Sequence, residues 1–132
     1  SRDSFSPSSR YNFTNLLRSM FAVELDNKLK KTSISVSAVH PGVTKSRQSR
    51  PYQVNKIRKS FYTYFSTNIN TGIAPILRGI EEVNVSSDLV FAPKIFGVYG
   101  EPALMRHNKL VYNQELRDKL WSYTANELNL DI

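Results

Sequence analysis

The stretch from Tyr11 to Leu25, YNFTNLLRSMFAVEL, predicts a long amphipathic helix. Apolar residues recur in it at intervals of three and four, the spacing that places side chains on one helix face. These residues are Phe13, Leu16, Leu17, Met20, Phe21 and Leu25. Ser8 or Ser9 can cap the start of this helix. We expect it to end near Lys30, because basic side chains suit the negative end of a helix dipole.

Outward from this helix, strand-like and helical segments alternate. Residues 32–39 (TSISVSAV) carry β-branched side chains and predict a buried strand, which His40-Pro41-Gly42 ends. Residues 53–65 and 73–82 predict two helices. The second of these has an apolar face that we expect to be buried, formed by Ile73, Ile76, Leu77 and Ile80.

The last third of the chain predicts one more strand and one more helix. Residues 94–100 (KIFGVYG) predict the strand, and Asn113 can cap a final helix that contains Trp121. Helices that separate buried strands indicate a parallel sheet covered on both faces. We therefore expect an α/β fold of about two strands and four helices. Two strands are few for such a sheet, so we expect part of the fold to lie elsewhere.

The composition excludes several kinds of site. The chain has 132 residues and no cysteine, which excludes disulfides, zinc–cysteine sites and thiol nucleophiles. His40 and His107 stand far apart without carboxylates at ligand spacing, so we expect no metal site. The apolar runs are far shorter than the ~20 residues of a membrane span. The polar start, SRDSFSPSSR, lacks a secretory signal and favours an intracellular location.

The order of these features resembles the C-terminal half of the short-chain dehydrogenase/reductase family. In that family a Tyr-x-x-x-Lys pair opens a long helix, commonly Y-x-x-S-K-x-A-N-x-L-F-x-x-E-L. This chain keeps the tyrosine, the hydroxyl before the lysine position, the phenylalanine and the Glu-Leu pair, at Tyr11, Thr14, Phe21, Glu24 and Leu25.

Three later motifs extend the resemblance. The family's next strand ends in H-P-G with a hydroxyl residue five positions after the proline, similar to V39-H40-P41-G42-V43-T44-K45-S46 here. A late G-x-Y strand core and a Leu-Trp helix pair resemble Gly97-Val98-Tyr99 and Leu120-Trp121. The retinol-dehydrogenase-like branch is the most similar in character.

The resemblance implies the C-terminal part of a Rossmann-like, doubly wound parallel sheet. It also implies NAD or NADP as cofactor and a small-molecule carbonyl or alcohol as substrate. Tyr11 would protonate the carbonyl oxygen. The nicotinamide end of the cofactor would lie against a set of five residues after the strand: Pro41, Gly42, Val43, Thr44 and Ser46.

Asn15 departs from the family pattern, because it stands where the lysine belongs. The lysine holds the nicotinamide ribose, and its charge lowers the pKa of the tyrosine from the ordinary value of about 10. Asn15 can hydrogen-bond a ribose hydroxyl but supplies no charge. Arg18, about one turn further along, is a conceivable substitute. We expect weakened or lost catalysis.

The family's glycine-rich dinucleotide turn and its catalytic serine are also absent from this sequence. We therefore expect residues 1–132 to be the C-terminal portion of one domain. A missing N-terminal half, or another chain, would complete the sheet. On this view the chain does not bind NAD or NADP alone. The alternative is a non-catalytic, degenerate family member that serves as a structural or interaction subunit of a larger assembly.

Residues 45–59, KSRQSRPYQVNKIRK, hold six basic residues and no acidic one, in a chain of net charge +7. The simplest interpretation is a solvated face over a buried aromatic stripe. The resemblance implies a substrate lid here. Docking on an anionic membrane surface ranks third. Binding of single-stranded nucleic acid, by phosphate contacts and base stacking, is the least favoured.

Overall fold

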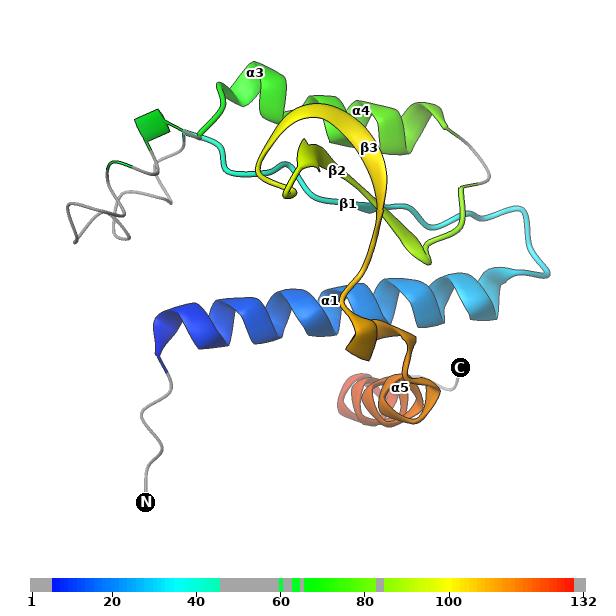
Figure 1. Ribbon diagram of the computed structural model, residues 1–132. Coiled ribbons are helices and arrows are strands. Elements are labelled where there is room, and N and C mark those ends of the chain that lie inside the picture. The colour runs from blue at the N-terminus through cyan, green and yellow to red at the C-terminus, as the bar shows by residue number, and fades with distance from the viewer. Residues whose placement is uncertain (1–5, 46–59, 61–62, 65, 83–84, 130–132) are drawn as a thin grey trace. The chain divides into compact units, whose positions relative to one another are not determined.

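A computed structural model describes residues 6–45, 60, 63–64, 66–82 and 85–129 (Figure 1). The chain is a mixed α/β protein, as the sequence predicts. Its helices are α1 (Pro7–Leu29), α3 (Ile69–Gly72), α4 (Ala74–Glu81), the 3₁₀-helix η2 (Lys109–Tyr112) and α5 (Gln114–Leu128). Its strands are β1 (Ala38–Val39), β2 (Leu89–Ile95) and β3 (Tyr99–Arg106). In the described part of the chain, no helix is both long and apolar enough to cross a membrane.

These elements form two compact units. The helical unit comprises Ser1–Val36, Ser86–Asp88 and His107–Ile132, and so contains α1, η2 and α5. The sheet unit comprises Ser37–Val85 and Leu89–Arg106, and so contains all three strands with α3 and α4.

In the helical unit, α1 packs against η2 and α5. Its core consists of Met20, Val23 and Val111, with Leu16, Leu17 and Leu120 packed around them. The N-cap of α1 is Ser6, whose Oγ accepts the Ser9 N–H at 3.2 Å. The prediction of Ser8 or Ser9 as the cap is therefore wrong. Pro7 explains the earlier start, because proline suits the first helical position.

A buried ion pair also joins α1 to α5. Arg117 Nε donates to Glu24 Oε2 at 3.2 Å, and both side chains are almost fully buried. Arg117 further donates to the Val111 carbonyl at 2.8 Å and to Gln114 Oε1. The guanidinium is thus well supplied with acceptors, which a buried charge requires.

The sheet unit has the strand order β1-β2-β3. β1 runs parallel to β2, with Ala38 opposite Val90 and Val39 opposite Phe91. β2 and β3 form an antiparallel hairpin whose register is irregular between Pro93 and Ile95. The parallel pairing of β1 with β2 confirms the expected α/β class. The prediction of a wholly parallel sheet is wrong, because β3 runs antiparallel to β2. The part of the sheet that the structure describes has three strands, where about two are expected from the sequence.

The boundaries predicted for the two strands, residues 32–39 and 94–100, are both wrong. Residues 94–100 contain the end of β2, a turn and the start of β3, because Phe96 and Gly97 both have positive φ, at 52° and 67°. Two such residues make a hairpin turn. The predicted strand 32–39 shrinks to Ala38–Val39. Its start is held instead by local bonds of Thr32 Oγ1, which donates to Leu29 O and accepts from Ile34 N–H.

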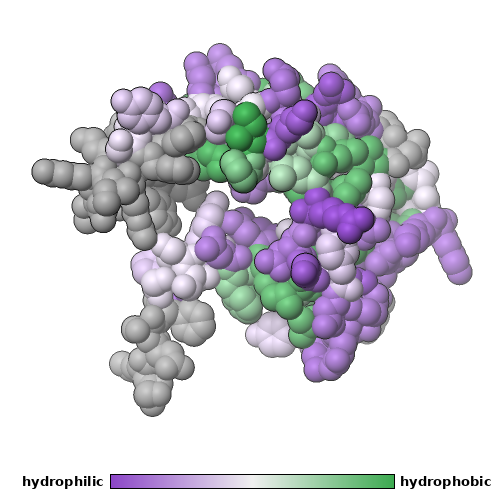
Figure 2. All heavy atoms as spheres, viewed as in Figure 1, coloured by the Kyte–Doolittle hydropathy of each residue, from purple (hydrophilic) through white to green (hydrophobic). Residues whose placement is uncertain are grey.

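The apolar face of α4 is exposed, contrary to the prediction. The exposed fractions are 46% for Ile73, 36% for Ile76, 49% for Leu77 and 70% for Ile80. The side of the helix turned inward carries the small residues Pro75, fully buried, and Gly79. A Cβ on Gly79 would lie 2.5 Å from Val39 Cγ1, so the helix approaches the sheet too closely for larger side chains. Figure 2 shows hydrophobic residues among hydrophilic ones at the surface around α4 and the sheet.

The predicted helix over residues 53–65 lies almost entirely outside the described residues, as does most of the basic segment 45–59. Only residues 60, 63 and 64 of that helix are described, and all three are helical.

Candidate functional site

Tyr11 and Asn15 lie one turn apart on α1, in the helical unit. Residues at this spacing share a helix face. Tyr11 is 51% exposed and Asn15 is half-buried, so the phenol is open to a reactant. The Thr14 hydroxyl between them is engaged, because Oγ1 donates to the Arg10 carbonyl at 2.9 Å. The pair offers one phenolic donor and one neutral amide, but no positive charge at the position where the family has its lysine.

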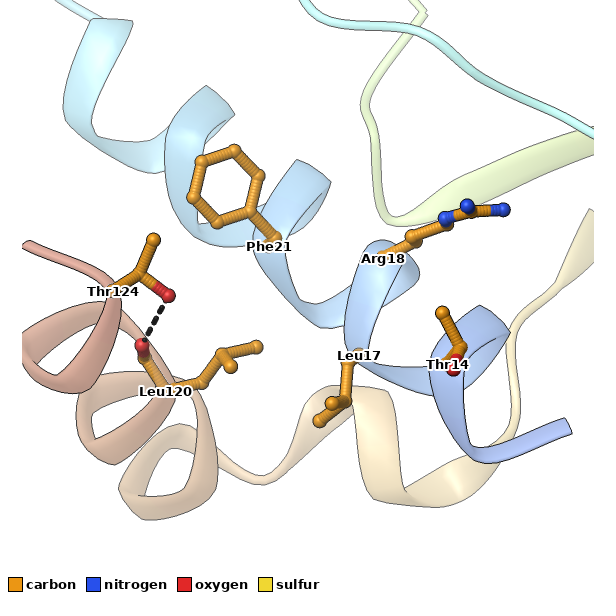
Figure 3. Close-up of a pocket in the computed structure, with 6 residues that line it drawn as sticks. All are labelled: Thr14, Leu17, Arg18, Phe21, Leu120 and Thr124. Atoms are coloured by element: carbon orange, nitrogen blue, oxygen red, sulfur yellow. Dashed lines mark hydrogen bonds between the residues drawn. The ribbon is translucent and has the colours of Figure 1, made fainter. Parts of the chain in front are cut away.

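A shallow groove lies next to this pair, between α1 and α5 (Figure 3). Its volume is about 270 Å³, and six residues line it: Thr14, Leu17, Arg18, Phe21, Leu120 and Thr124. The Thr124 hydroxyl donates to Leu120 O at 2.8 Å, so both lining hydroxyls bond to their own helices. Neither Tyr11 nor Asn15 lines the groove. It is smaller and more open than the clefts that bury a ligand, and we assign it no catalytic role.

The other predicted site residues lie in the sheet unit, in the loop that follows the carboxyl end of β1. Val43 N–H donates to Val98 O at 3.2 Å, which ties this loop to the β2–β3 hairpin. Thr44 forms a parallel bridge with Thr67. On either side of that bridge, Thr67 N–H donates to Val43 O at 2.8 Å and Lys45 N–H to Thr67 O at 3.0 Å. The loop is therefore held in place along its length.

Gly42 makes the sharp turn of this loop. Its φ is 73°, in the left-handed region, and a Cβ there would lie 2.5 Å from the Val98 carbonyl oxygen. Only glycine meets both conditions without strain. Gly42 therefore lets the loop backbone approach the β2–β3 hairpin closely.

His40 stands at the start of the same loop. Partial burial lowers the pKa of His40, since desolvation disfavours the charged ring. The Gly42 N–H donates to His40 Nδ1 at 2.9 Å, and this bond requires the neutral ring as well. His40 serves the loop geometry rather than acid–base chemistry.

The structure places the predicted residues in two groups. Tyr11 and Asn15 share one helix of the helical unit, and Pro41, Gly42, Val43 and Thr44 share one loop of the sheet unit. Ser46 lies outside the described residues. Among the residues that are described, no group of three or more potential ligands could hold a metal ion.

Sequence reasoning missed one polar cluster, formed in the helical unit by Asp26, Ser87 and His107. The Ser87 hydroxyl donates to Asp26 Oδ2 at 3.0 Å, and His107 Nε2 lies 3.0 Å from the Ser87 carbonyl oxygen. A nucleophilic triad needs the histidine on the serine hydroxyl and the carboxylate on the histidine. Here the hydroxyl bonds to the carboxylate and the histidine to the backbone. The cluster therefore fixes the 86–88 segment onto α1.

Comparisons with protein-family models, curated proteins and solved structures give no match for this chain. Its function must be inferred from its own residues.

Proposed function

We propose that the chain is the C-terminal portion of an NAD(P)-dependent oxidoreductase of the short-chain dehydrogenase/reductase family, with weakened or lost catalysis. The observation that supports it best is the parallel pairing of β1 with β2, with α3 and α4 between them in the sequence. A loop with the family's H-P-G sequence follows the carboxyl end of β1. In open α/β sheets, ligands bind beyond the carboxyl ends of the strands.

The roles divide between the two groups of residues. Tyr11 carries the proton that the carbonyl oxygen of the substrate receives, and its exposed hydroxyl suits this role. The backbone of the loop from Pro41 to Thr44 suits the nicotinamide end of NAD or NADP, because Gly42 admits a close approach at this turn. When bound, that cofactor supplies the hydride. The sequence holds no glycine-rich turn for the pyrophosphate, so we propose that this turn belongs to an N-terminal half.

Asn15 limits the rate in this proposal. Loss of one electrostatic contribution to a transition state commonly costs roughly a hundred-fold in rate. Asn15 retains a hydrogen bond for the ribose and loses the charge. The same substitution supports the second candidate function, a non-catalytic subunit, in which neither the charge nor the missing half is needed for chemistry.

The test uses the longest native form of the protein that contains these residues. We expect it to oxidise NADPH slowly with a small aldehyde or ketone, and Tyr11→Phe to abolish the reaction without changing the fold. A parallel fluorescence titration of the 132-residue chain with NADPH should show no binding. Wild-type protein that neither binds NADPH nor turns over in any form would favour the non-catalytic subunit.

A further inference from the structure

Two buried side-chain atoms in the described part of the chain have no hydrogen-bond partner, Ser66 Oγ in the sheet unit and Trp121 Nε1 in the helical unit. Buried polar atoms in folded proteins are as a rule paired, so each exception needs a physical explanation. The Trp121 ring stacks on Phe21 with 5.3 Å between the ring centroids, so aromatic packing accounts for its position. Ser66 differs, because it lies directly before Thr67, which forms the bridge with Thr44 in the loop after β1.

The Ser66 hydroxyl is not needed to hold this loop in place. Val43 O accepts the Thr67 N–H at 2.8 Å and also the Thr67 hydroxyl at 3.4 Å. Thr67 O in turn accepts the Lys45 N–H at 3.0 Å. The bonds between the loop and the segment of Ser66 are thus made by the neighbouring threonine. The Ser66 hydroxyl remains available to a group from outside the chain.

The pairing of the loop shows which way the Ser66 side chain points. Thr44 faces α3, because a Cβ added to Gly72 of that helix would lie 2.1 Å from Thr44 Cγ2. Paired residues on neighbouring strands point to the same side, and successive residues along a strand point to opposite sides. Thr67 therefore shares the side of Thr44, and Ser66 points away from α3.

Ser66 also lies just below the surface. Its own side chain is 8% exposed, whereas Tyr64 is 83% exposed and Asn68 is exposed as well. A hydrogen bond in such a shielded place is electrostatically stronger than one in water. A serine hydroxyl can donate one hydrogen bond and accept two, so it suits either the N–H or the C=O of an amide. The nicotinamide end of NAD or NADP carries such an amide, its carboxamide.

We infer that Ser66 Oγ hydrogen-bonds the carboxamide of NAD or NADP, beside the loop backbone from Pro41 to Thr44. This inference rests on the proposed function, which places the nicotinamide end of the cofactor at that loop. Ser66 adds to the site a side chain from a second segment of the chain, on the other side of the Thr44–Thr67 bridge. Its role is to bind and orient the cofactor, and proton transfer stays with Tyr11.

The first test measures the denaturant midpoint of the 132-residue chain. Ser66→Ala should raise the midpoint, because it removes a hydroxyl that is buried without a partner. The matched control is Thr67→Val, which removes the neighbouring hydroxyl and with it a bond to Val43 O, so its midpoint should fall. A fall for Ser66→Ala as well would show that its hydroxyl is already paired within the chain, and would overturn the inference.

The second test titrates the longest native form of the protein with NADPH and follows the nucleotide fluorescence. Ser66→Ala should raise the Kd for NADPH about tenfold, the size expected for one hydrogen bond. The kcat at saturating NADPH should stay unchanged, because a contact that only binds the cofactor affects the ground state and the transition state equally. Thr67→Val should leave the Kd at the wild-type value.

The two ways of failing are distinct. An unchanged Kd in Ser66→Ala, as expected if a water molecule or the carbonyl substrate were the partner of the hydroxyl, would overturn the inference and leave the proposed function standing. Wild-type protein that binds no NADPH would overturn the proposed function, and the inference with it.

Discussion

Gly42 is the residue whose replacement tests the loop after β1 most directly. Gly42 and Gly97 both have positive φ, at 73° and 67°, but a Cβ on Gly97 would meet nothing within 4 Å. Gly97→Ala should therefore cost only the left-handed penalty of roughly 1–2 kcal/mol. Gly42→Ala should cost a further ~1–3 kcal/mol, because its Cβ would lie against the Val98 carbonyl. Denaturant unfolding measures both losses, and equal losses would contradict the described turn.

His40 should give the stability of the chain a small dependence on pH. Burial holds the pKa of His40 below its ordinary value of about 6.5, so the unfolded state binds the proton more readily. The contribution is complete above about pH 6.5 and is lost as the pH falls through the folded-state pKa. His40→Asn should flatten the unfolding free energy over this range, relative to wild type. An unchanged slope in the variant would show that His40 is not the group responsible.

At the scale of elements, the contact between α1 and α5 depends on a buried charge pair. Glu24→Gln should cost about 3–5 kcal/mol, because it leaves the Arg117 guanidinium buried without its counter-ion. The double variant Glu24→Leu with Arg117→Met should cost less than the sum of the single changes Glu24→Leu and Arg117→Met. Lys119→Met is the control on the same helix: its exposed pair with Glu115 contributes at most about 1 kcal/mol. Additive losses in the double-mutant cycle would rule out direct coupling.

The exposed apolar face of α4, formed by Ile73, Ile76, Leu77 and Ile80, should contribute little to the free energy of unfolding of the 132-residue chain. Ile80 is 70% exposed, so Ile80→Ala should change the unfolding free energy by less than about 0.5 kcal/mol. Met20→Ala, in the core of the helical unit, should cost about 2–5 kcal/mol. Thermal unfolding of both variants makes the comparison. A large loss of stability on Ile80→Ala would mean that this face of α4 is already covered in the chain.

Local chemistry explains which elements could be predicted. The Asn113 cap was predicted correctly, since its Oδ1 accepts the Leu116 N–H at 3.1 Å and α5 begins at the next residue. The hairpin was missed because Lys94 to Gly100 looks like one apolar run, whereas positive φ at Phe96 breaks it. The apolar face of α4 is exposed although the sequence predicts that it is buried, because periodicity identifies an apolar face without showing what covers it.

At the scale of the whole molecule, sequence spacing predicts only the near neighbours of the candidate site. Tyr11 and Asn15 share a helix face because they are four residues apart, and the Pro41–Thr44 loop follows from its own turn residues. Contacts between distant residues were not foreseen: Arg117 meets Glu24 across 93 positions, and Ser87 meets Asp26 across 61. Such pairs depend on the tertiary fold and leave no local pattern. The relation of Tyr11 to a cofactor is of this long-range kind, so it needs a functional test.

Asn15→Lys provides that test in the longest native form of the protein. A cation one turn from Tyr11 favours its phenolate and restores the missing electrostatic contribution, so we expect kcat to rise roughly a hundred-fold in NADPH-dependent carbonyl reduction. Asn15→Met is the matched control, because it has comparable length and no charge. Arg18→Gln in the wild-type background tests whether Arg18, an exposed cation, already supplies part of the positive charge that Asn15 lacks. A gain with lysine alone would mean that the rest of the site is intact. Equal rates for lysine and methionine would mean that charge at position 15 does not limit the reaction, and the family's chemistry would then not apply to this chain.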